Sequence, residues 1–229
     1  MRYLIAETSW TMMTLAQELC ANGTLLTRTD RPEDVPQYLR LGQADLLLLE
    51  ADQLGQNGLA LASLRAEFPD TPIALVASKP NHEQIASWLG AGADCIVPAE
   101  AEPEETIMRL QAVVRRVHDL ATPEVAHGPL RIDLHQRKAF LLGCPIKLSP
   151  KLYELLEYIA LRPGRLVTRA ELLSHVYGLE DEPDARVFDV YICNLRACLK
   201  AACGAVDIET VRGSGFRFAV HDSPAQIAA

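Results

Sequence analysis

Short apolar segments alternate with segments of helical periodicity through the first half of the chain, and this alternation constrains the fold more than any other feature. The strand-like segments are residues 2–6, 24–27, 45–50, 72–77 and 94–98. The helical segments that follow them are residues 10–21, 33–41, 58–67, 82–90 and 103–119. Strict alternation predicts an α/β fold with a doubly wound, five-stranded parallel sheet that helices cover on both faces.

The third strand-like segment, DLLLLE at 45–50, holds four consecutive leucines and ends at a carboxylate, Glu50. The leucines predict a strand that is buried on both faces. Ligands and chemistry in open α/β sheets lie at the carboxyl ends of the strands, so the residues that follow each strand form the candidate site. These are Glu7, Thr8, Glu50, Ala77, Ser78 and Ala99.

The first half resembles the receiver domain of response regulators. The resemblance is carried by the spacing from Glu50 to Gly58, the TPI at 71–73 and the GAD at 92–94. It implies a flavodoxin-like sheet with a phosphoacceptor aspartate after the third strand. It also implies an acidic pair for Mg²⁺ after the first strand, a hydroxyl residue after the fourth and a lysine after the fifth.

This chain departs from the receiver pattern at each of these places: it has Glu50, Glu7 with Thr8, Ala77 and Ala99. Phosphoryl transfer needs a correctly placed nucleophile and cations on the phosphoryl oxygens, so we expect a receiver that is not phosphorylated.

Glu50 has two interpretations, a solvated strand end or a permanent imitation of the phosphorylated state. A weak Mg²⁺ site at Glu7 and Glu50 stays open, because Mg²⁺ is held by one or two carboxylates; no other metal or cofactor is expected. Trp10, Met12 and Met13 are interpreted as helix packing or as a plug of the acidic pocket.

Charge divides the chain into two unequal parts. Residues 1–123 hold 9 Lys and Arg against 17 Asp and Glu, whereas the remainder holds 13 of each. A surface that binds a polyanion is therefore expected in the second part. Pro and Gly punctuate residues 120–129, which predicts a linker between a domain at 1–119 and a second domain at 130–221.

The second part has the order of elements of a winged helix-turn-helix. Strand-like pieces at 130–135, 138–143 and 145–149 precede a helix that opens at Ser149-Pro150, a helix that opens at the capping box Thr168–Glu171, a helix from Asp184 to Gly204 and a hairpin at 207–220. The third helix is the expected recognition helix, and the hairpin is the expected wing.

The third helix sorts its residues onto two faces. Phe188, Ile192, Leu195 and Leu199 form an apolar stripe, and the opposite face presents Arg186, Val190, Cys193, Asn194 and Ala197. Arginine and asparagine can read guanine and adenine edges, and valine can contact a thymine methyl group. Arg212 at the hairpin is a candidate for a minor groove or a phosphate.

TVRGSGFRF at 210–218 resembles the wing signature of the OmpR/PhoB subfamily, and the segment 175–199 resembles its branch that contains the alphaproteobacterial cell-cycle regulator CtrA. The resemblance implies a transcription regulator that binds double-stranded DNA through Arg186, Tyr191, Asn194, Arg196, Thr210 and Arg212. Ala197 and Cys198 stand where relatives are often basic, which favours weaker and less salt-sensitive binding.

The same resemblance implies a homodimer through helix 4, strand 5 and helix 5 of the receiver. Its expected contact residues are Trp88, Asp94, Glu105, Arg109 and Arg116, with Asp94 as a partner of Arg116. Ser87 and Cys95 replace two other charged partners. Trp88 with the apolar residues Ile107, Leu110 and Val114 is interpreted as a substitute, and plain core is the alternative for the three residues of helix 5. We expect this dimer to form without phosphate.

The remaining features favour a cytoplasmic regulator that is not an enzyme and does not enter a membrane. The six cysteines show no C-x-x-C pattern and no secretion signal precedes them, so reduced thiols are expected. RNA polymerase is a further expected partner. Two alternatives stay open: a conventional phosphorylated regulator that uses a displaced acid such as Asp52, and a protein-interaction adaptor whose winged helix does not bind DNA.

Overall fold

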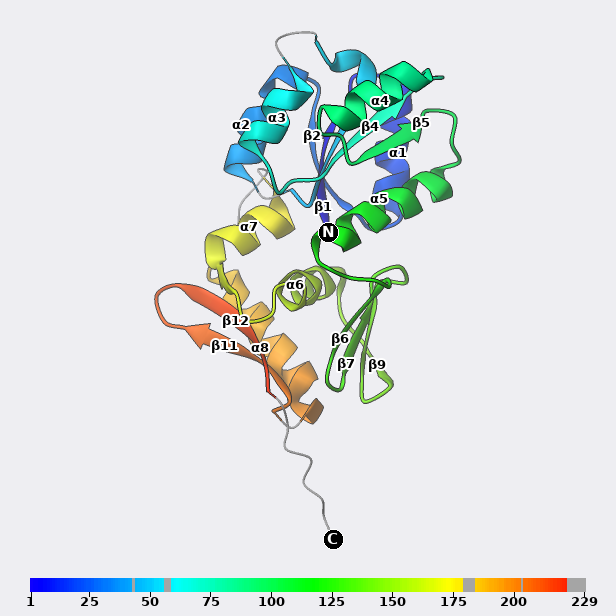
Figure 1. Cartoon of the computed structure of the whole chain (residues 1–229). Coiled ribbons are helices and arrows are strands. Elements are labelled where there is room, and N and C mark those ends of the chain that lie inside the picture. Colours follow the sequence, from blue (N-terminus) through cyan, green and yellow to red (C-terminus); the bar gives the residue numbers. More distant parts are fainter. Residues whose placement is uncertain (43, 56–58, 179–183, 203, 222–229) are drawn as a thin grey trace. The chain divides into compact units, whose positions relative to one another are not determined.

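The structure is a computed structural model of the 229-residue chain, and it describes all residues except 43, 56–58, 179–183, 203 and 222–229 (Figure 1). The described part divides into two compact units, Met1–Asp119 and Leu120–Ala229. Each unit has its own sheet and helices.

The N-terminal unit is built on a five-stranded sheet in which every neighbouring pair of strands is parallel. The strands are β1 (Arg2–Ala6), β2 (Leu25–Thr29), β3 (Leu46–Glu50), β4 (Ile73–Ala77) and β5 (Cys95–Pro98). Their order, β2-β1-β3-β4-β5, is the flavodoxin-like order, so the predicted doubly wound parallel sheet is confirmed.

The helices of this unit are α1 (Trp10–Ala21), α2 (Val35–Leu41), α3 (Leu61–Glu67), α4 (His82–Gly90) and α5 (Pro103–Val117). Two 3₁₀ turns, η1 (Pro32–Asp34) and η2 (Ala51–Gln53), precede α2 and follow β3. The predicted helix at 58–67 begins three residues later, at Leu61, and its predicted first residue, Gly58, lies outside the described residues.

The four leucines of β3 are fully buried, as predicted for a central strand. Leu47 and Leu49 pack with Leu4, Leu75 and other side chains into one apolar cluster on one side of the sheet. Glu50, the last residue of the strand, is half-buried and marks the point where the strand reaches the edge of this core.

The C-terminal unit opens with an antiparallel four-stranded sheet, β6 (Glu124–His127), β7 (Leu130–Asp133), β8 (Lys138–Leu141) and β9 (Cys144–Ile146). The predicted linker at 120–129 is wrong for the residues of β6, which pair with β7. Val125 is buried against the unit, and Gly128 adopts a positive φ of 54° that turns the chain into β7. One buried side chain in a four-residue strand is too weak a periodicity to find from sequence.

The rest of this unit is the predicted winged helix-turn-helix. Its helices are α6 (Pro150–Ala160), α7 (Arg169–Tyr177) and α8 (Val187–Leu199), which continues as the 3₁₀ turn η3 (Lys200–Ala202). A second sheet, in the order β10-β12-β11, consists of β10 (Leu166–Thr168), β11 (Val206–Val211) and β12 (Gly215–Val220). The predicted helix from Asp184 is shorter than expected at both ends.

The hairpin β11–β12 depends on two glycines for different reasons. Gly213 has a φ of 73°, which an L-residue with a Cβ adopts only with strain. Gly215 lies so close to β10 that a Cβ there would be 2.1 Å from the Val167 carbonyl oxygen. The first glycine makes the turn, and the second lets the wing pair with β10.

No helix of the described residues combines the length and the apolar character that a bilayer crossing requires.

Candidate nucleic-acid interface and receiver site

Helix α8 holds its apolar stripe in the core and its polar face in solvent, as the sequence predicts. Phe188, Ile192, Leu195 and Leu199 are all buried. Phe188 contacts the rings of Tyr177 and Tyr191 edge-on, with centroid distances of 6.4 and 5.9 Å. These contacts fix the rotation of α8 about its axis and so decide which residues face outward.

The outward face of α8 includes Arg186 at the N-cap, Val190, Cys193, Asn194 and Ala197, all of them exposed, and Asp189 is exposed as well. The Arg186 side chain is 89% exposed, and its Nε lies 4.0 Å from the Asp184 carboxylate. A surface of one guanidinium, one amide and three small side chains can enter a major groove and offers both hydrogen-bond donors and methyl contacts to base edges.

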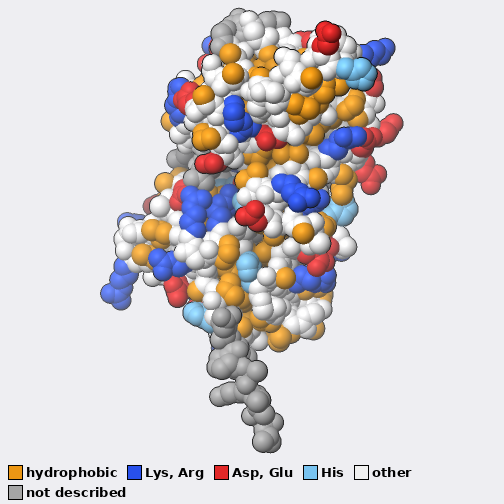
Figure 2. Space-filling model, viewed as in Figure 1, with side chains coloured by type: hydrophobic (Ala, Val, Ile, Leu, Met, Phe, Trp, Pro, Cys, Tyr) orange, Lys and Arg blue, Asp and Glu red, His pale blue; other side chains and the backbone are white. Residues whose placement is uncertain are grey.

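The wing carries two of the predicted DNA-contact residues, Thr210 and Arg212, and both are exposed. Arg212 follows the last residue of β11 and precedes the turn glycine Gly213. Figure 2 shows basic side chains at the tip of the β11–β12 hairpin. Exposed cations on a narrow hairpin suit phosphates or a minor groove.

Arg196 is held by hydrogen bonds to a neighbouring strand, whereas the Arg186 side chain is largely exposed. Its Nε donates to the Ile208 carbonyl at 2.7 Å, a second guanidinium nitrogen also donates to that carbonyl, and the same nitrogen donates to Thr210 Oγ1 at 2.8 Å. The arginine therefore ties α8 to β11. No sequence pattern indicates this link, because the partners are 12 and 14 residues away along the chain.

Tyr191 is held in a similar way. Its hydroxyl lies 3.0 Å from the Tyr177 hydroxyl, and the ammonium of Lys151 lies 4.2 Å from the Tyr177 ring centroid. The hydrogen bond to Tyr177, with a smaller effect of burial, raises the pKa of Tyr191. The phenol stays protonated at neutral pH and can donate to an acceptor such as a phosphate.

Arg169 is a residue of this region that the sequence did not single out. It is the first residue of α7, and it pairs with Asp189 of α8 at 2.7 Å while its guanidinium lies 4.8 Å from the Phe216 ring centroid in β12. It therefore joins α7, α8 and the wing. The capping box at Thr168 located the start of α7 but carried no signal for this contact.

In the N-terminal unit, Glu50 is held by hydroxyl groups at the end of β3. Thr8 Oγ1 donates to one carboxylate oxygen at 3.3 Å, and Ser9 Oγ donates to the other at 3.0 Å. Ser9 also caps α1 by accepting a hydrogen bond from the Met12 amide at 3.2 Å. The carboxylate is thus part of a structural link between β3 and the start of α1.

The other residues of the predicted acidic pocket are placed as follows. Glu7 pairs with Arg28 of β2 at 3.2 Å, Ala77 is buried at the end of β4, and Ala99 donates its amide to the Ala77 carbonyl at 2.9 Å. Neither alanine supplies the hydroxyl or the cation of a phosphoryl site.

Both carboxylates of the expected weak Mg²⁺ site contact protein groups in this structure, and the site itself stays a prediction. Mg²⁺ binds where carboxylate oxygens can turn toward it, but Glu7 turns to Arg28 and Glu50 accepts from two hydroxyls. Across the residues that the structure describes, no three Asp, Glu, His or Cys side chains gather closely enough to hold a metal ion.

Four further sequence candidates lie near the same strand ends. Asp52 lies within η2 and is exposed. Met12 is buried in the core, whereas Trp10 is 82% exposed and Met13 is also exposed. Helix packing is confirmed for Met12, and the interpretation of Trp10 and Met13 as packed or plugging residues is wrong.

The predicted dimer residues mostly have partners within the chain. Asp94 accepts from Arg65 at 2.5 Å and from the Ile73 amide at 2.7 Å, and Arg109 pairs with Glu105 at 2.7 Å. Trp88 is half-buried against the core of the unit, and Arg116 is exposed.

Of the two interpretations of Ile107, Leu110 and Val114, plain core is confirmed and an apolar substitute for interface ion pairs is wrong, because all three are buried in the unit's own core. They lie on the inner face of α5. Their spacing of three and four residues identifies one apolar face of a helix, but it does not tell whether that face packs inside the unit or against a partner.

Comparisons with known proteins place these observations in context. A family model described as "Transcriptional regulatory protein, C terminal" matches residues 143–218. The cell cycle transcriptional regulator CtrA of Caulobacter vibrioides is 31% identical over 215 residues, which are 93% of this chain and 93% of that protein. The cell cycle response regulator CtrA of Brucella anthropi is 33% identical over 190 residues, 82% of each chain. Among solved structures, the DNA-binding domain of Klebsiella pneumoniae RstA in complex with the RstA box is 31% identical and covers 43% of this chain and 98% of its own, with a TM-score of 0.37.

Proposed function

The chain belongs to the OmpR/PhoB family of response-regulator transcription factors, together with CtrA, and from this premise we propose that it binds a specific double-stranded DNA sequence as a dimer and without phosphorylation. Its proposed site of action is the cytoplasm, where its DNA lies, and RNA polymerase is a proposed partner.

The proposed reading surface is the outward face of α8. Arg186 and Asn194 are placed to hydrogen-bond base edges, and Val190 is placed to contact a thymine methyl group, because all three are exposed on a helix whose opposite face is buried. Arg212 and Thr210 of the wing supply the proposed contacts to phosphate or the minor groove.

Tyr191 and Arg196 have a different part in DNA binding under this proposal. Both hydrogen-bond within the unit, Tyr191 to Tyr177 and Arg196 to β11, so they set the angle between α8, α7 and the wing. Their remaining donor capacity can still meet a phosphate. Four of the six predicted DNA residues thus face outward. The other two, Tyr191 and Arg196, hold the elements that carry these four and can also contact a phosphate.

The proposed absence of phosphorylation rests on the hydrogen bonds that Glu50 accepts. Its two oxygens accept from Thr8 and Ser9, and the residues at the neighbouring strand ends, Ala77 and Ala99, offer no group to stabilise a transferred phosphoryl. Of the two interpretations of Glu50, these contacts favour a strand-end carboxylate over an imitation of a phosphoryl group, although the carboxylate is half-buried and held by two hydroxyls and not fully solvated.

The experiment is incubation of the full-length protein with acetyl phosphate and Mg²⁺, followed by intact-mass measurement. We expect an unchanged mass. A mass increase of about 80 Da, that of one phosphoryl group, would establish a conventional regulator, and loss of the adduct in Asp52→Asn would assign it to the displaced acid.

A second measurement separates DNA binding from the adaptor alternative. We expect affinity for random duplex to fall as salt rises, since phosphate contacts release counterions, and selection from a randomised duplex pool to yield one recurrent sequence. An affinity that does not change with salt, together with a pool that yields no recurrent sequence, would establish the adaptor.

A further inference from the structure

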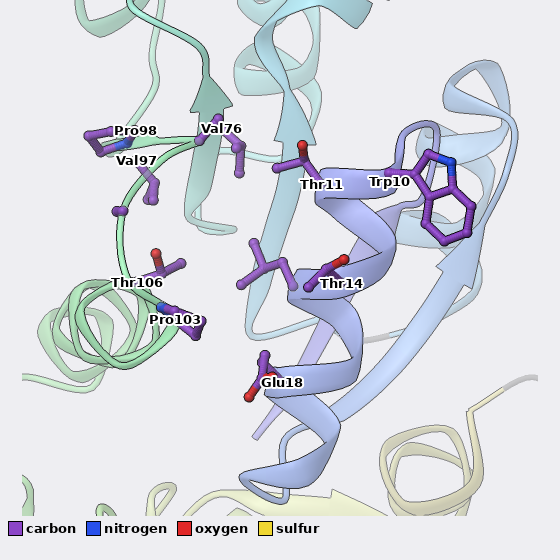
Figure 3. Close-up of a pocket in the computed structure, with 12 residues that line it drawn as sticks. Trp10, Thr11, Thr14, Glu18, Val76, Val97, Pro98, Pro103 and Thr106 are labelled. Atoms are coloured by element: carbon purple, nitrogen blue, oxygen red, sulfur yellow. The ribbon is translucent and has the colours of Figure 1, made fainter.

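A cavity of about 320 Å³ lies in the N-terminal unit between α1 and α5, beside the carboxyl ends of β4 and β5 (Figure 3). Its walls are largely apolar and include Leu15, Val76, Val97, Pro98, Ala101 and Pro103. Cavities that bind small molecules in proteins begin at about 300 Å³ and have mostly apolar walls with a few polar groups. The size and the walls thus suit a small organic molecule.

The polar groups of the cavity come from both helices. Thr11 and Thr14 lie on α1, and Thr106 lies across from them on α5 (Figure 3). Thr106 is only 3% exposed. Its hydroxyl is one of the few polar groups that a molecule bound in this cavity could contact.

Glu18 supplies the only charge among the residues that line this cavity. Its side chain is half-buried, and it forms no ion pair within the described part of the chain. Next to apolar walls a carboxylate attracts a cation more strongly than in open water, and the surrounding residues 1–123 carry a net charge of −8 (9 − 17).

Two features keep the cavity open. Ala99, which follows β5, lines it with a single methyl group. Trp10 also lines it, but its ring points away from the other lining residues, on the outer side of α1 (Figure 3). Neither residue fills the space, so a ligand need not displace a packed side chain.

We propose that this cavity is a binding site for a small organic cation with an apolar body, such as an aromatic or branched amine. The ammonium group lies at Glu18, and the body lies against Val76, Val97 and Ala99. This site is independent of the DNA surface, because all of its residues belong to the N-terminal unit.

The test uses three probes with the same apolar body and different head groups: phenethylammonium, 2-phenylethanol and phenylacetate. Each is titrated into the ¹⁵N-labelled full-length protein, and amide chemical shifts are followed. We expect the cation to shift amides of α1, of α5 and of the ends of β4 and β5. Its Kd is expected to be about threefold to tenfold lower than that of the alcohol, and that of the anion the highest, as a partly exposed ion pair allows.

Two kinds of variant locate the site, one that removes the charge and one that fills the cavity. Glu18→Gln should raise the Kd of the cation to that of the alcohol and leave the Kd of the alcohol unchanged. The control Glu83→Gln, on exposed α4, should change neither Kd. Ala101→Leu should remove binding of both by filling the cavity, and Ala99→Val serves the same purpose if Ala101→Leu does not fold.

Three results would overturn the proposal. Absence of shifts for all three probes at their solubility limits would remove the site. Equal Kd values for the cation and the alcohol would remove the cation preference, and binding that survives both filling variants would place the ligand elsewhere. None of these results touches DNA binding, which is measured separately in the C-terminal unit.

Discussion

At the residue scale, two arginines at the recognition helix differ in exposure, and we expect them to differ in function. Arg186 projects into solvent, whereas Arg196 donates three hydrogen bonds to β11. We predict that Arg186→Ala leaves the unfolding temperature unchanged and weakens binding to the selected sequence by about 1–3 kcal/mol, the usual value of a base-edge contact.

Arg196→Ala should behave in the opposite way. It leaves the Ile208 carbonyl without its charged donor, so we expect the free energy of unfolding to fall by about 1.5–3 kcal/mol and affinity for every sequence to fall together. Differential scanning calorimetry and binding to selected and scrambled duplexes check both variants. Equal loss of specificity in the two variants would contradict this division.

Cys193 offers a chemical probe of the same face. It is exposed at the centre of the outward surface of α8, whereas Cys144 is exposed on β9. We predict that excess specific duplex slows alkylation of Cys193 by iodoacetamide and leaves Cys144 unchanged, because only the first thiol is covered. Mass spectrometry of tryptic peptides measures both rates in one sample, and equal protection of the two thiols would show that α8 is not the reading helix.

A third thiol, Cys95, is half-buried in β5, and this burial raises its pKa. The thiolate is the reactive form, so Cys95 should alkylate slowly with or without DNA and serves as an internal reference.

At the residue scale, sequence periodicity sufficed for the two faces of α8, since a helix repeats every 3.6 residues and the stripe is unambiguous. It did not reveal the ion pairs of Arg65 with Asp94 or of Arg169 with Asp189, because these partners are 29 and 20 residues apart and meet only after folding. It also could not show that Glu7 turns to Arg28, for the same reason.

At the scale of elements, the wing depends on a close approach between two strands. Gly215 of β12 pairs with Thr168 of β10, and a Cβ at this glycine would be 2.1 Å from the Val167 carbonyl oxygen. We predict that Gly215→Ala destabilises the C-terminal unit by about 1–3 kcal/mol, the usual cost of overpacking, because β10 must move away.

The matched control is Gly213→Asn in the turn. Gly213 has a φ of 73°, but no atom lies within 4 Å of the position that a Cβ would take there, and asparagine tolerates this backbone region. Hydrogen exchange of the full-length protein measures both variants. Faster exchange in β10 and β12 is expected for Gly215→Ala alone, and similar exchange in the two variants would mean that turn geometry, not strand contact, is limiting.

The two strands that were not predicted from the sequence, β6 and β10, are four and three residues long. Such strands bury one or two side chains, so their alternation is too short to distinguish from a loop, and pairing with neighbours stabilises them. The strands of the parallel sheet were predictable because most of them are apolar runs between helices; β2, LLTRT at Leu25–Thr29, is the least apolar, and it extends two residues beyond its predicted end at 27.

At the scale of the whole molecule, the proposed dimer must rest on apolar surface, because the charged residues expected at its interface are largely engaged within the chain. Glu105 pairs with Arg109, and Asp94 pairs with Arg65. Leu89 of α4 and Met108 of α5 are exposed, on two of the elements that the family resemblance implies in pairing.

We therefore predict that the full-length protein sediments as a dimer at micromolar concentration without acetyl phosphate or Mg²⁺, and that raising the salt from about 0.1 to about 0.5 M, which screens exposed charges, does not dissociate it. Leu89→Asp with Met108→Asp should yield monomers, because an apolar interface would have to bury two unpaired carboxylates. Leu41→Asp changes an exposed leucine of α2, outside the proposed interface, and should leave the dimer intact.

Dimers that dissociate at the higher salt would instead point to ion pairs between protomers, and a monomeric wild-type protein would mean that DNA, and not the receiver, brings two protomers together.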